Sequence, residues 1–435
     1  MELWAVSLVL LAVFAVTLIG GLWIAISLLC VAIVAMAAFT NAPPGALMAT
    51  TVWGASASWS LTPLPLFIWM GEILYRTRVS SDMFRGLAPW VDPLPGRLMH
   101  TNVVGCGIFA AISGSSAATA ATIGRISIPE LLKRGYDERM AIGSLAGAGT
   151  LGLLIPPSIM MIVYGVAADV SVARLFVAGV LPGIVLMLMF SGYIALWALL
   201  NPARTPPREA ITTLMEKIAA ARLLIPTILL IAVVIGSIYT GIATPTESAV
   251  LGVVGSLVIS AVGGSLTRKA FGASVMGAMK TSCMIAFILT GASFLTVAMG
   301  FTGIPRAMAA WIGAQAFEPW QLIAVLTVLF IILGMFLDGI SMIVLTASVI
   351  LPSVKAAGID LLWFGIYIVL VVEMAQVTPP VGFNLFVLQG LTGKDMFYVA
   401  RATLPFFFLM VVAVVLIWVV PEIVTYLPGK MFKLG

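Results

Sequence analysis

The chain has 435 residues, of which 62% are hydrophobic and 9% charged, and its mean hydropathy is +1.17. Apolar runs of about 20 residues follow one another for most of its length, which predicts an all-α polytopic membrane protein and excludes a sizeable soluble domain. The net charge of +5 does not indicate a nucleic-acid partner, and the single histidine argues against a Ser–His hydrolase. Three cysteines without a CxxC pair argue against a zinc site. The sequence has no GxxxxGK[ST] loop, which argues against an ATPase of that class.

The first half of the chain, residues 1–200, opens with the apolar segment Glu2–Gly20. This segment lacks a basic n-region and is followed by further apolar chain, so we expect a retained helix rather than a cleaved signal. Later in this half, one apolar segment too short to span the membrane ends at Ser113, and a second returns to Pro129. The two segments predict a re-entrant helical hairpin over about 98–131.

A helix over about 138–168 follows the hairpin and is interrupted in mid-length by Pro156 and Pro157. Proline breaks a helix interior, so the pair predicts a discontinuous membrane helix. The alternative is that the prolines mark an ordinary loop end, but apolar chain continues on both sides of them. Non-helical backbone at that depth is tolerated only inside protein or beside a polar cavity.

A basic linker, 201–223, leads to a second half, 224–423, and a tail, 424–435. A shift of 223 residues places four prolines of the first half on prolines of the second: Pro129 on Pro352, Pro156 and Pro157 on Pro379 and Pro380, and Pro182 on Pro405. The chain is therefore predicted to contain two structural repeats.

The repeat predicts a second hairpin over about 321–355 and a second broken helix over about 361–390. Paired breaks at corresponding positions of two halves are the sequence signature of a transporter site. We expect the repeats to be inverted. Short basic loops stay inside, which places the linker and the loop 76–99 in the cytoplasm and the weakly charged loop 299–322 in the periplasm.

Polar groups gather at the predicted hairpin tips and helix breaks. Hydroxyl, carboxylate and backbone carbonyl oxygens suit a hard cation such as Na⁺, and free helix N-termini suit an anionic group. Sodium contacts are predicted at the following residues: Ser113, Ser115, Ser116, Gly152, Pro156, Asp338, Ser341, Thr378 and Gly382. Substrate contacts are predicted at Gly114, Arg125, Pro157 and Asn384.

Each of these assignments has an alternative. Small residues also let membrane helices pack closely, which is the other role open to the run 113–116. Arg125 either faces an anionic substrate or extends its guanidinium to the membrane interface near Pro129. Ser115 and Asp338 are equivalent at the 223 offset, so the two predicted sites are similar in layout but different in charge.

Two glutamates stand apart from the predicted sites. Glu247 in TPTES is expected to lie in the first turn of a helix that Thr244 or Thr246 caps. Glu373 precedes Thr378 in the second broken helix and can pair with a nearby cation.

Four ordered motifs, GSSAATAATIGRISIP, RGYDERMAIGSLAGAGTLGLLIPPSI, TPTESAV and VTPPVGFNLFV, give the chain a family resemblance over nearly its whole length. It resembles the large membrane subunit of tripartite ATP-independent periplasmic (TRAP) transporters. The resemblance implies two inverted repeats and an elevator mechanism, in which a mobile domain carries substrate and Na⁺ across a fixed scaffold. It also implies the bacterial inner membrane, Na⁺ as the co-transported ion and no organic cofactor.

The resemblance further implies three partners besides the lipid bilayer: a small four-helix membrane subunit, a periplasmic substrate-binding protein and a small organic acid or similar polar solute as substrate. The alternative function is a self-sufficient ion-coupled carrier of the same broad fold that needs no binding protein. An intramembrane enzyme or a purely structural scaffold is a third hypothesis, and the single histidine, His100, disfavours the enzyme.

Overall fold

The computed structural model is all-helical over the residues that it describes, 3–207, 213–314 and 318–431. The helices of the first half are α1 (Leu3–Ile19), α2 (Ile24–Phe39), α3 (Pro44–Ser56), η1 (Trp59–Leu61), α4 (Pro63–Tyr75), α5 (Val79–Val91), η2 (Arg97–Met99), α6 (His100–Ser113), α7 (Ser116–Lys133), α8 (Glu138–Leu154), α9 (Ile159–Ala168) and α10 (Val172–Leu200).

The rest of the chain continues the helical pattern. Its helices are η3 (Pro202–Arg204), α11 (Leu214–Ala221), α12 (Ile225–Tyr239), α13 (Pro245–Val262), α14 (Arg268–Thr302), α15 (Ile304–Ala314), α16 (Pro319–Gly334), α17 (Gly339–Ala356), α18 (Leu361–Gln376), α19 (Phe383–Thr392), α20 (Met396–Val419) and α21 (Glu422–Met431). Part of the predicted linker, 208–212, and of the predicted tail, 432–435, lies outside the described residues.

The helix bounds themselves recur at the offset of 223. Adding 223 to the bounds of α7, 116 and 133, gives 339 and 356, which are the bounds of α17. The same shift carries α8 onto α18 and α9 onto α19 to within one residue at each end. Two hairpins and two broken helices therefore stand at corresponding places in the chain, while the inverted relation of the halves stays a prediction.

One segment departs from this correspondence. The apolar runs 46–75 and 269–298 match in sequence, yet the first forms α3, η1 and α4, and the second lies within the 35-residue helix α14. Pro63 and Pro65 stand at the start of α4, where the equivalent positions of α14 are Ala286 and Ile288. Because proline lacks the amide hydrogen that a helix interior uses, only the first half breaks here.

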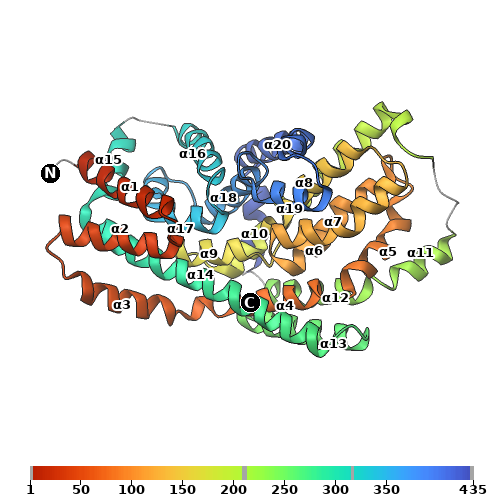
Figure 1. Cartoon of the computed structure of the whole chain (residues 1–435), viewed down its shortest axis with the longest axis horizontal. Helices are drawn as coiled ribbons and strands as arrows, with labels where there is room; N and C mark the ends of the chain where they lie inside the picture. Colours follow the sequence, from red (N-terminus) through yellow and green to blue (C-terminus); the bar gives the residue numbers. More distant parts are fainter. Residues whose placement is uncertain (1–2, 208–212, 315–317, 432–435) are drawn as a thin grey trace.

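The two broken helices form the centre of the molecule. Every residue of 140–154 in α8 and of 362–376 in α18 is buried. The other helices pack around this pair, and Figure 1 shows α8, α18 and α9 in the middle of the molecule. Both helices are therefore shielded from the surroundings along almost their whole length.

Glycines on α8 make this close packing possible. A Cβ at Gly143 would lie 2.2 Å from the carbonyl oxygen of Ala402, and one at Gly147 would lie 2.6 Å from Phe406, both on α20. On another face, a Cβ at Gly149 would lie 2.8 Å from Ala120 of α7. Small residues of this kind let helix backbones approach each other in membranes.

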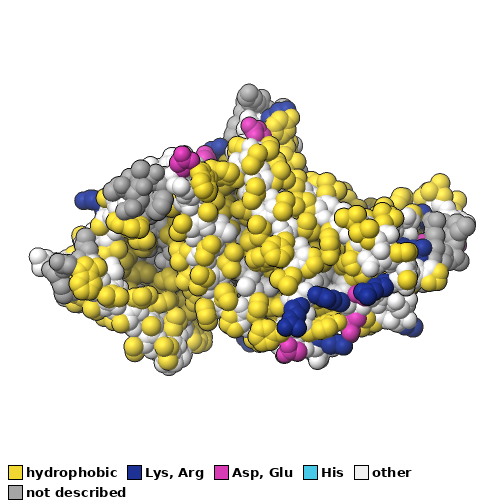
Figure 2. All heavy atoms as spheres, turned by 90° about the horizontal axis from the view of Figure 1, so that it is seen from above, with side chains coloured by type: hydrophobic (Ala, Val, Ile, Leu, Met, Phe, Trp, Pro, Cys, Tyr) yellow, Lys and Arg dark blue, Asp and Glu magenta, His cyan; other side chains and the backbone are white. Residues whose placement is uncertain are grey.

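The outer surface is apolar. Hydrophobic side chains cover most of the face in Figure 2, and Leu188, Val262 and Phe408 are among the large ones left exposed. By length and composition, five helices of the described residues (α10, α13, α14, α17 and α20) are long and apolar enough to cross a membrane, or up to seven spans if each of the bent pairs α8–α9 and α11–α12 counts as one. Such a surface suits lipid, and the predicted all-α polytopic membrane fold is confirmed.

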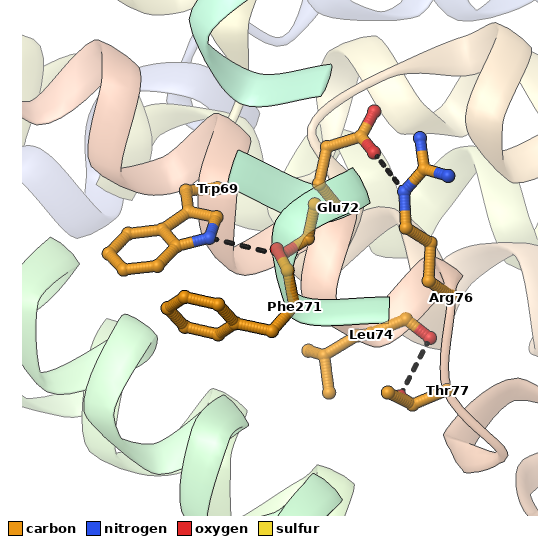
Figure 3. A network of polar contacts seen from close by, with 7 residues as sticks. Trp69, Glu72, Leu74, Arg76, Thr77 and Phe271 are labelled. Carbon is orange, nitrogen blue, oxygen red and sulfur yellow. Dashed lines mark hydrogen bonds and ion pairs between the residues drawn. The ribbon is translucent and has the colours of Figure 1, made fainter. Parts of the chain in front are cut away.

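Polar contacts join α4 of the first half to α14 of the second (Figure 3). The indole nitrogen of Trp69 donates to the hydroxyl of Ser274 at 3.2 Å, and the rings of Trp69 and Phe271 meet edge to face with centroids 5.9 Å apart, a spacing typical of aromatic pairs. Arg76, which directly follows α4, pairs with Glu72 of that helix at 2.8 Å. The two halves are thus joined outside the central pair as well.

At the start of α13, the expected cap is present. The hydroxyl of Thr244 accepts a hydrogen bond from the amide of Glu247, whose carboxylate in turn accepts one from the amide of Thr244 at 2.8 Å. This capping box satisfies two amide groups that the helix leaves free. Glu247 therefore has the helix-capping role that its position predicts.

Candidate functional site

The first hairpin turns at Gly114, between α6 and α7. Gly114 has φ +59°, a left-handed conformation that ends α6, and the Ser115 side chain then caps α7 by accepting from the amide of Ala118. A Cβ at Gly114 would lie 2.7 Å from the carbonyl oxygen of Pro157. The hairpin tip therefore sits directly on the break of the first broken helix.

A second glycine brings the two backbones together. A Cβ at Gly152 would lie 2.5 Å from the carbonyl oxygen of Ser115 and 2.8 Å from the amide nitrogen of Ser116. On the far side of the break, the amide of Ile159 donates to the carbonyl oxygen of Gly114 at 3.4 Å. The structure thus brings the predicted residues of the first half, 113–116 and 152–157, into one cluster.

The hydroxyl groups of this tip already have partners. Ser113 and Thr119 share a hydrogen bond of 2.8 Å, and Thr119 also donates to the carbonyl oxygen of Ser115 at 2.8 Å. The hydroxyl of Ser116 donates to the side-chain oxygen of Gln376, across the molecule on α18. Oxygen lone pairs remain available on these groups, since each hydroxyl can accept as well as donate.

The second hairpin turns at Asp338, which caps α17. Its Oδ2 accepts from the amides of Ile340, at 3.1 Å, and Ser341, at 3.2 Å, and its Oδ1 accepts from the Ser341 hydroxyl. Ser115 and Asp338 are thus N-caps at equivalent positions. The two tips have the same layout, with a carboxylate in one where the other has a hydroxyl.

The second break, 377–382, is polar as well. The Thr378 hydroxyl donates to the carbonyl oxygen of Met374 at 2.7 Å, and Gly382 begins α19 in a left-handed conformation, φ +44°. A Cβ at Gly382 would lie 2.9 Å from the Thr378 carbonyl oxygen. Within the described residues no hydrogen bond joins this pair to Asp338 and Ser341, so the second cluster is held together less directly than the first.

Two fully buried polar side chains flank this break. In the part of the chain that the structure describes, neither amide atom of Asn384 has a hydrogen-bond partner, and the Glu373 carboxylate has only the Thr150 hydroxyl and the Leu154 backbone beside it, neither in hydrogen-bond geometry. Thr150, the repeat equivalent of Glu373, lies beside the carboxylate but donates its own hydrogen bond to Gly147. Buried polar groups without partners are costly, which marks both as candidate contacts for an ion or a solute.

Arg125 lies apart from these clusters. It is exposed on α7, with its guanidinium carbon 5.9 Å from the ring centroid of Tyr75. Nine residues separate it from Ser116, which corresponds to about 14 Å along the helix axis. The structure therefore does not bring Arg125 to the hairpin tip, and its cation–π contact accounts for its position.

A cavity of about 550 Å³ opens between α5 and α7. Its lining is mixed, with Phe84 and Leu98 beside the charged side chains Arg85, Glu130 and Arg134. This cavity lies on the same helix as Arg125 but at the end remote from the tip. It offers a space with a mixed polar and apolar lining beside the first hairpin.

Sequence reasoning missed two of the residues that build the site. Thr119 follows Ser115 by four residues, about one helical turn, and this spacing predicts that its hydroxyl lies beside the tip. Gln376 is the last polar residue before the second break, but its contact with Ser116 depends on how the halves meet. The spacing of residues within either half therefore does not predict the contact between Ser116 and Gln376.

Paired hairpins and broken helices at corresponding places of two halves are an arrangement that secondary transporters use. The chain shares this fold with the crystal structure of the YdaH transporter from Alcanivorax borkumensis, with TM-score 0.63, 13% identity and 89% of each chain covered.

The family follows from the sequence comparisons. The chain matches the tripartite ATP-independent periplasmic transporter, DctM component, over residues 11–423, and it belongs to that family. It is 32% identical to the C4-dicarboxylate TRAP transporter large permease protein DctM of Pseudomonas aeruginosa, over 88% of this chain and 89% of that one. It is 29% identical to the ectoine TRAP transporter large permease protein TeaC of Halomonas elongata, over 86% and 87%. The chain is thus a transporter permease and not an enzyme.

Proposed function

We propose that the chain is the large permease subunit of a sodium-coupled TRAP transporter that imports a small organic acid or a similar polar solute. One observation carries this proposal: the two N-caps Ser115 and Asp338 stand at equivalent hairpin tips, and the first tip lies on the helix break at Gly152. The two tips carry hydroxyl and carbonyl oxygens and, at Asp338, one carboxylate. Ligands of this type suit Na⁺.

We further propose an elevator mechanism. In this proposal the mobile domain consists of the two hairpins and the two broken helices, α6–α9 and α16–α19, whose members contact one another. The scaffold consists of the outer helices, among them α4 and α14, which the Trp69–Ser274 hydrogen bond joins (Figure 3). The cavity between α5 and α7 then lies where a scaffold arm faces the mobile hairpin, on the predicted cytoplasmic side, and its charged lining suits the release of a polar solute.

The partners and the substrate belong to the same proposal. The family's tripartite description supports a small membrane subunit and a periplasmic binding protein beside this chain in a bacterial inner membrane. The relatives named for C4-dicarboxylates and for ectoine support a small polar solute. Arg125, which is remote from the tips, does not narrow the choice.

The test is uptake into proteoliposomes that contain the permease with both partner proteins. A radiolabelled solute, chosen by a thermal-shift screen of the binding protein, is offered with an inward Na⁺ gradient, with K⁺ in place of Na⁺, and with ATP alone. We expect uptake only with the Na⁺ gradient. Undiminished uptake with Na⁺ absent on both sides contradicts sodium coupling, and undiminished uptake without the binding protein favours a self-sufficient carrier.

A further inference from the structure

The side chain of Gln376 lies between the two hairpin tips. Gln376 is the last residue of α18, and only 9% of its surface is exposed. Its Oε1 accepts a hydrogen bond from the hydroxyl of Ser116, the first residue of α7 in the first hairpin. One end of the amide is therefore fixed to the first tip.

The other end of the amide lies against the second tip. A Cβ at Gly339, the first residue of α17, would lie 3.6 Å from Nε2 of Gln376, so this end of the amide packs against the second tip, and no hydrogen bond joins the two in the described residues. It would also lie 2.4 Å from Val372, one turn earlier on α18, so the backbone of the second tip packs tightly on this helix. Turning the amide by 180° exchanges its oxygen and nitrogen but leaves one polar atom at each tip.

The two contacted residues are equivalent in the repeat. Ser116 and Gly339 are separated by 223 residues, and each directly follows the N-cap of its hairpin, Ser115 or Asp338. The repeat equivalent of Gln376 is Leu153, a buried apolar residue of α8. Among the described residues, the amide between the two tips is therefore supplied by the second half alone.

We propose that Gln376 is a positioning residue that ties the two hairpin tips together and couples ion binding at one tip to ion binding at the other. The inference rests on the sodium-coupled function proposed above. An ion bound at the first tip holds Ser116 and, through its hydrogen bond, the side chain of Gln376, which then stays packed against the second tip at Gly339. The second ion then meets a tip that is already ordered, which is positive coupling.

This role differs from that of a ligand. Gln376 itself need not touch Na⁺, and its loss leaves both N-caps in place. Couplings between sites in proteins typically change affinity by about 5- to 150-fold. Loss of the tie is therefore expected to raise the half-saturating Na⁺ concentration at least about fivefold and to lower the Hill coefficient toward one.

The experiment compares Gln376→Leu, Ser116→Ala and the double variant in the reconstituted transporter with both partner proteins. The measured quantities are the Hill coefficient and half-saturating Na⁺ of uptake, together with amide hydrogen exchange at residues 113–118 and 338–342. The matched controls are Gln389→Leu on α19 and Ser127→Ala on α7, since no hydrogen bond of either side chain is present in the described residues.

We expect both single variants to lower the Hill coefficient for Na⁺. The double variant is expected to have a Hill coefficient no lower than that of either single variant. Amide hydrogen exchange at residues 338–342 is expected to be faster in Ser116→Ala. A purely structural role would lower the melting temperature without changing the Hill coefficient. Faster exchange at the second tip supports the tie even if uptake proves independent of Na⁺, a result that overturns sodium coupling alone. A Hill coefficient of one in the unmodified transporter, or unchanged exchange at the second tip in both variants, overturns the proposal.

Discussion

Asp338 allows the charge of the second hairpin tip to be tested apart from its role as a helix cap. Its carboxylate accepts from two backbone amides and from the Ser341 hydroxyl. Asparagine is as good an N-cap as aspartate, because its side-chain oxygen accepts the same amide hydrogen bonds. Asp338→Asn is therefore expected to leave the free energy of unfolding nearly unchanged, whereas Asp338→Ala costs about 1 kcal/mol.

The expected effect on ion binding is larger. A unit charge 4 Å from a cation contributes about 4 kcal/mol at an effective dielectric constant of 20. Because Asp338 is only half-buried, solvent screens part of this interaction. Half of it, about 2 kcal/mol, corresponds to a rise of roughly 30-fold in the half-saturating Na⁺ concentration.

The assay is uptake into proteoliposomes as a function of Na⁺, with thermal melting of the same preparations. The matched control is Asp395→Asn, because Asp395 caps α20 in the same way at an exposed loop, where its carboxylate accepts from the amide of Phe397 at 2.9 Å. We expect the control to keep the Na⁺ dependence of the unmodified protein. Unchanged Na⁺ affinity in Asp338→Asn would show that Asp338 serves only as a helix cap.

Three further changes test other parts of the structure. Gly152→Ala places a methyl group against the backbone of the first tip and should destabilise the protein by about 1 to 3 kcal/mol in thermal melting. Its control, Gly192→Ala, has nothing within 4 Å of the added methyl group and should not destabilise the protein. Equal effects of the two substitutions would contradict the close approach at Gly152. In Na⁺-free buffer, Glu373→Leu removes a buried carboxyl group without a hydrogen bond in the described residues and should stabilise the protein by about 1 to 3 kcal/mol, whereas a lower melting temperature would contradict this cost of burial. In a cysteine-free background, an impermeant thiol reagent applied from the periplasm should label a cysteine at Thr302 and spare one at Ser81, and the reverse pattern would refute the predicted topology.

Much of the fold could be predicted from the positions of the prolines. Pro156 and Pro379 lie at the observed breaks, and the hairpins turn beside the predicted polar residues because Ser115 and Asp338 are both good N-caps. These are local effects, and a local pattern is enough to predict them. The break at 57–62 cannot be predicted from hydropathy alone, because hydropathy does not distinguish 46–75 from its continuous equivalent, 269–298.

The parts of the site that could not be predicted depend on contacts between distant segments. Gln376 reads as an ordinary helix-end residue until Ser116 is placed beside it, 260 positions away. Arg125 has the charge expected of a substrate ligand, but its place on α7 directs it to Tyr75. The pattern within one half therefore predicts where each site forms, while the packing of the two halves decides which side chains reach it.

The complete burial of α8 and α18 has a practical consequence for measuring motion in this protein. A spin label or fluorophore needs room for a bulky linker, and neither helix offers that room between 140 and 154 or between 362 and 376. Probes of the proposed elevator movement therefore belong at exposed positions. One can replace Phe386 on α19, in the proposed mobile domain, and the other can replace Trp53 on the outer helix α3. Distances between such positions report displacement of the buried pair without disturbing it.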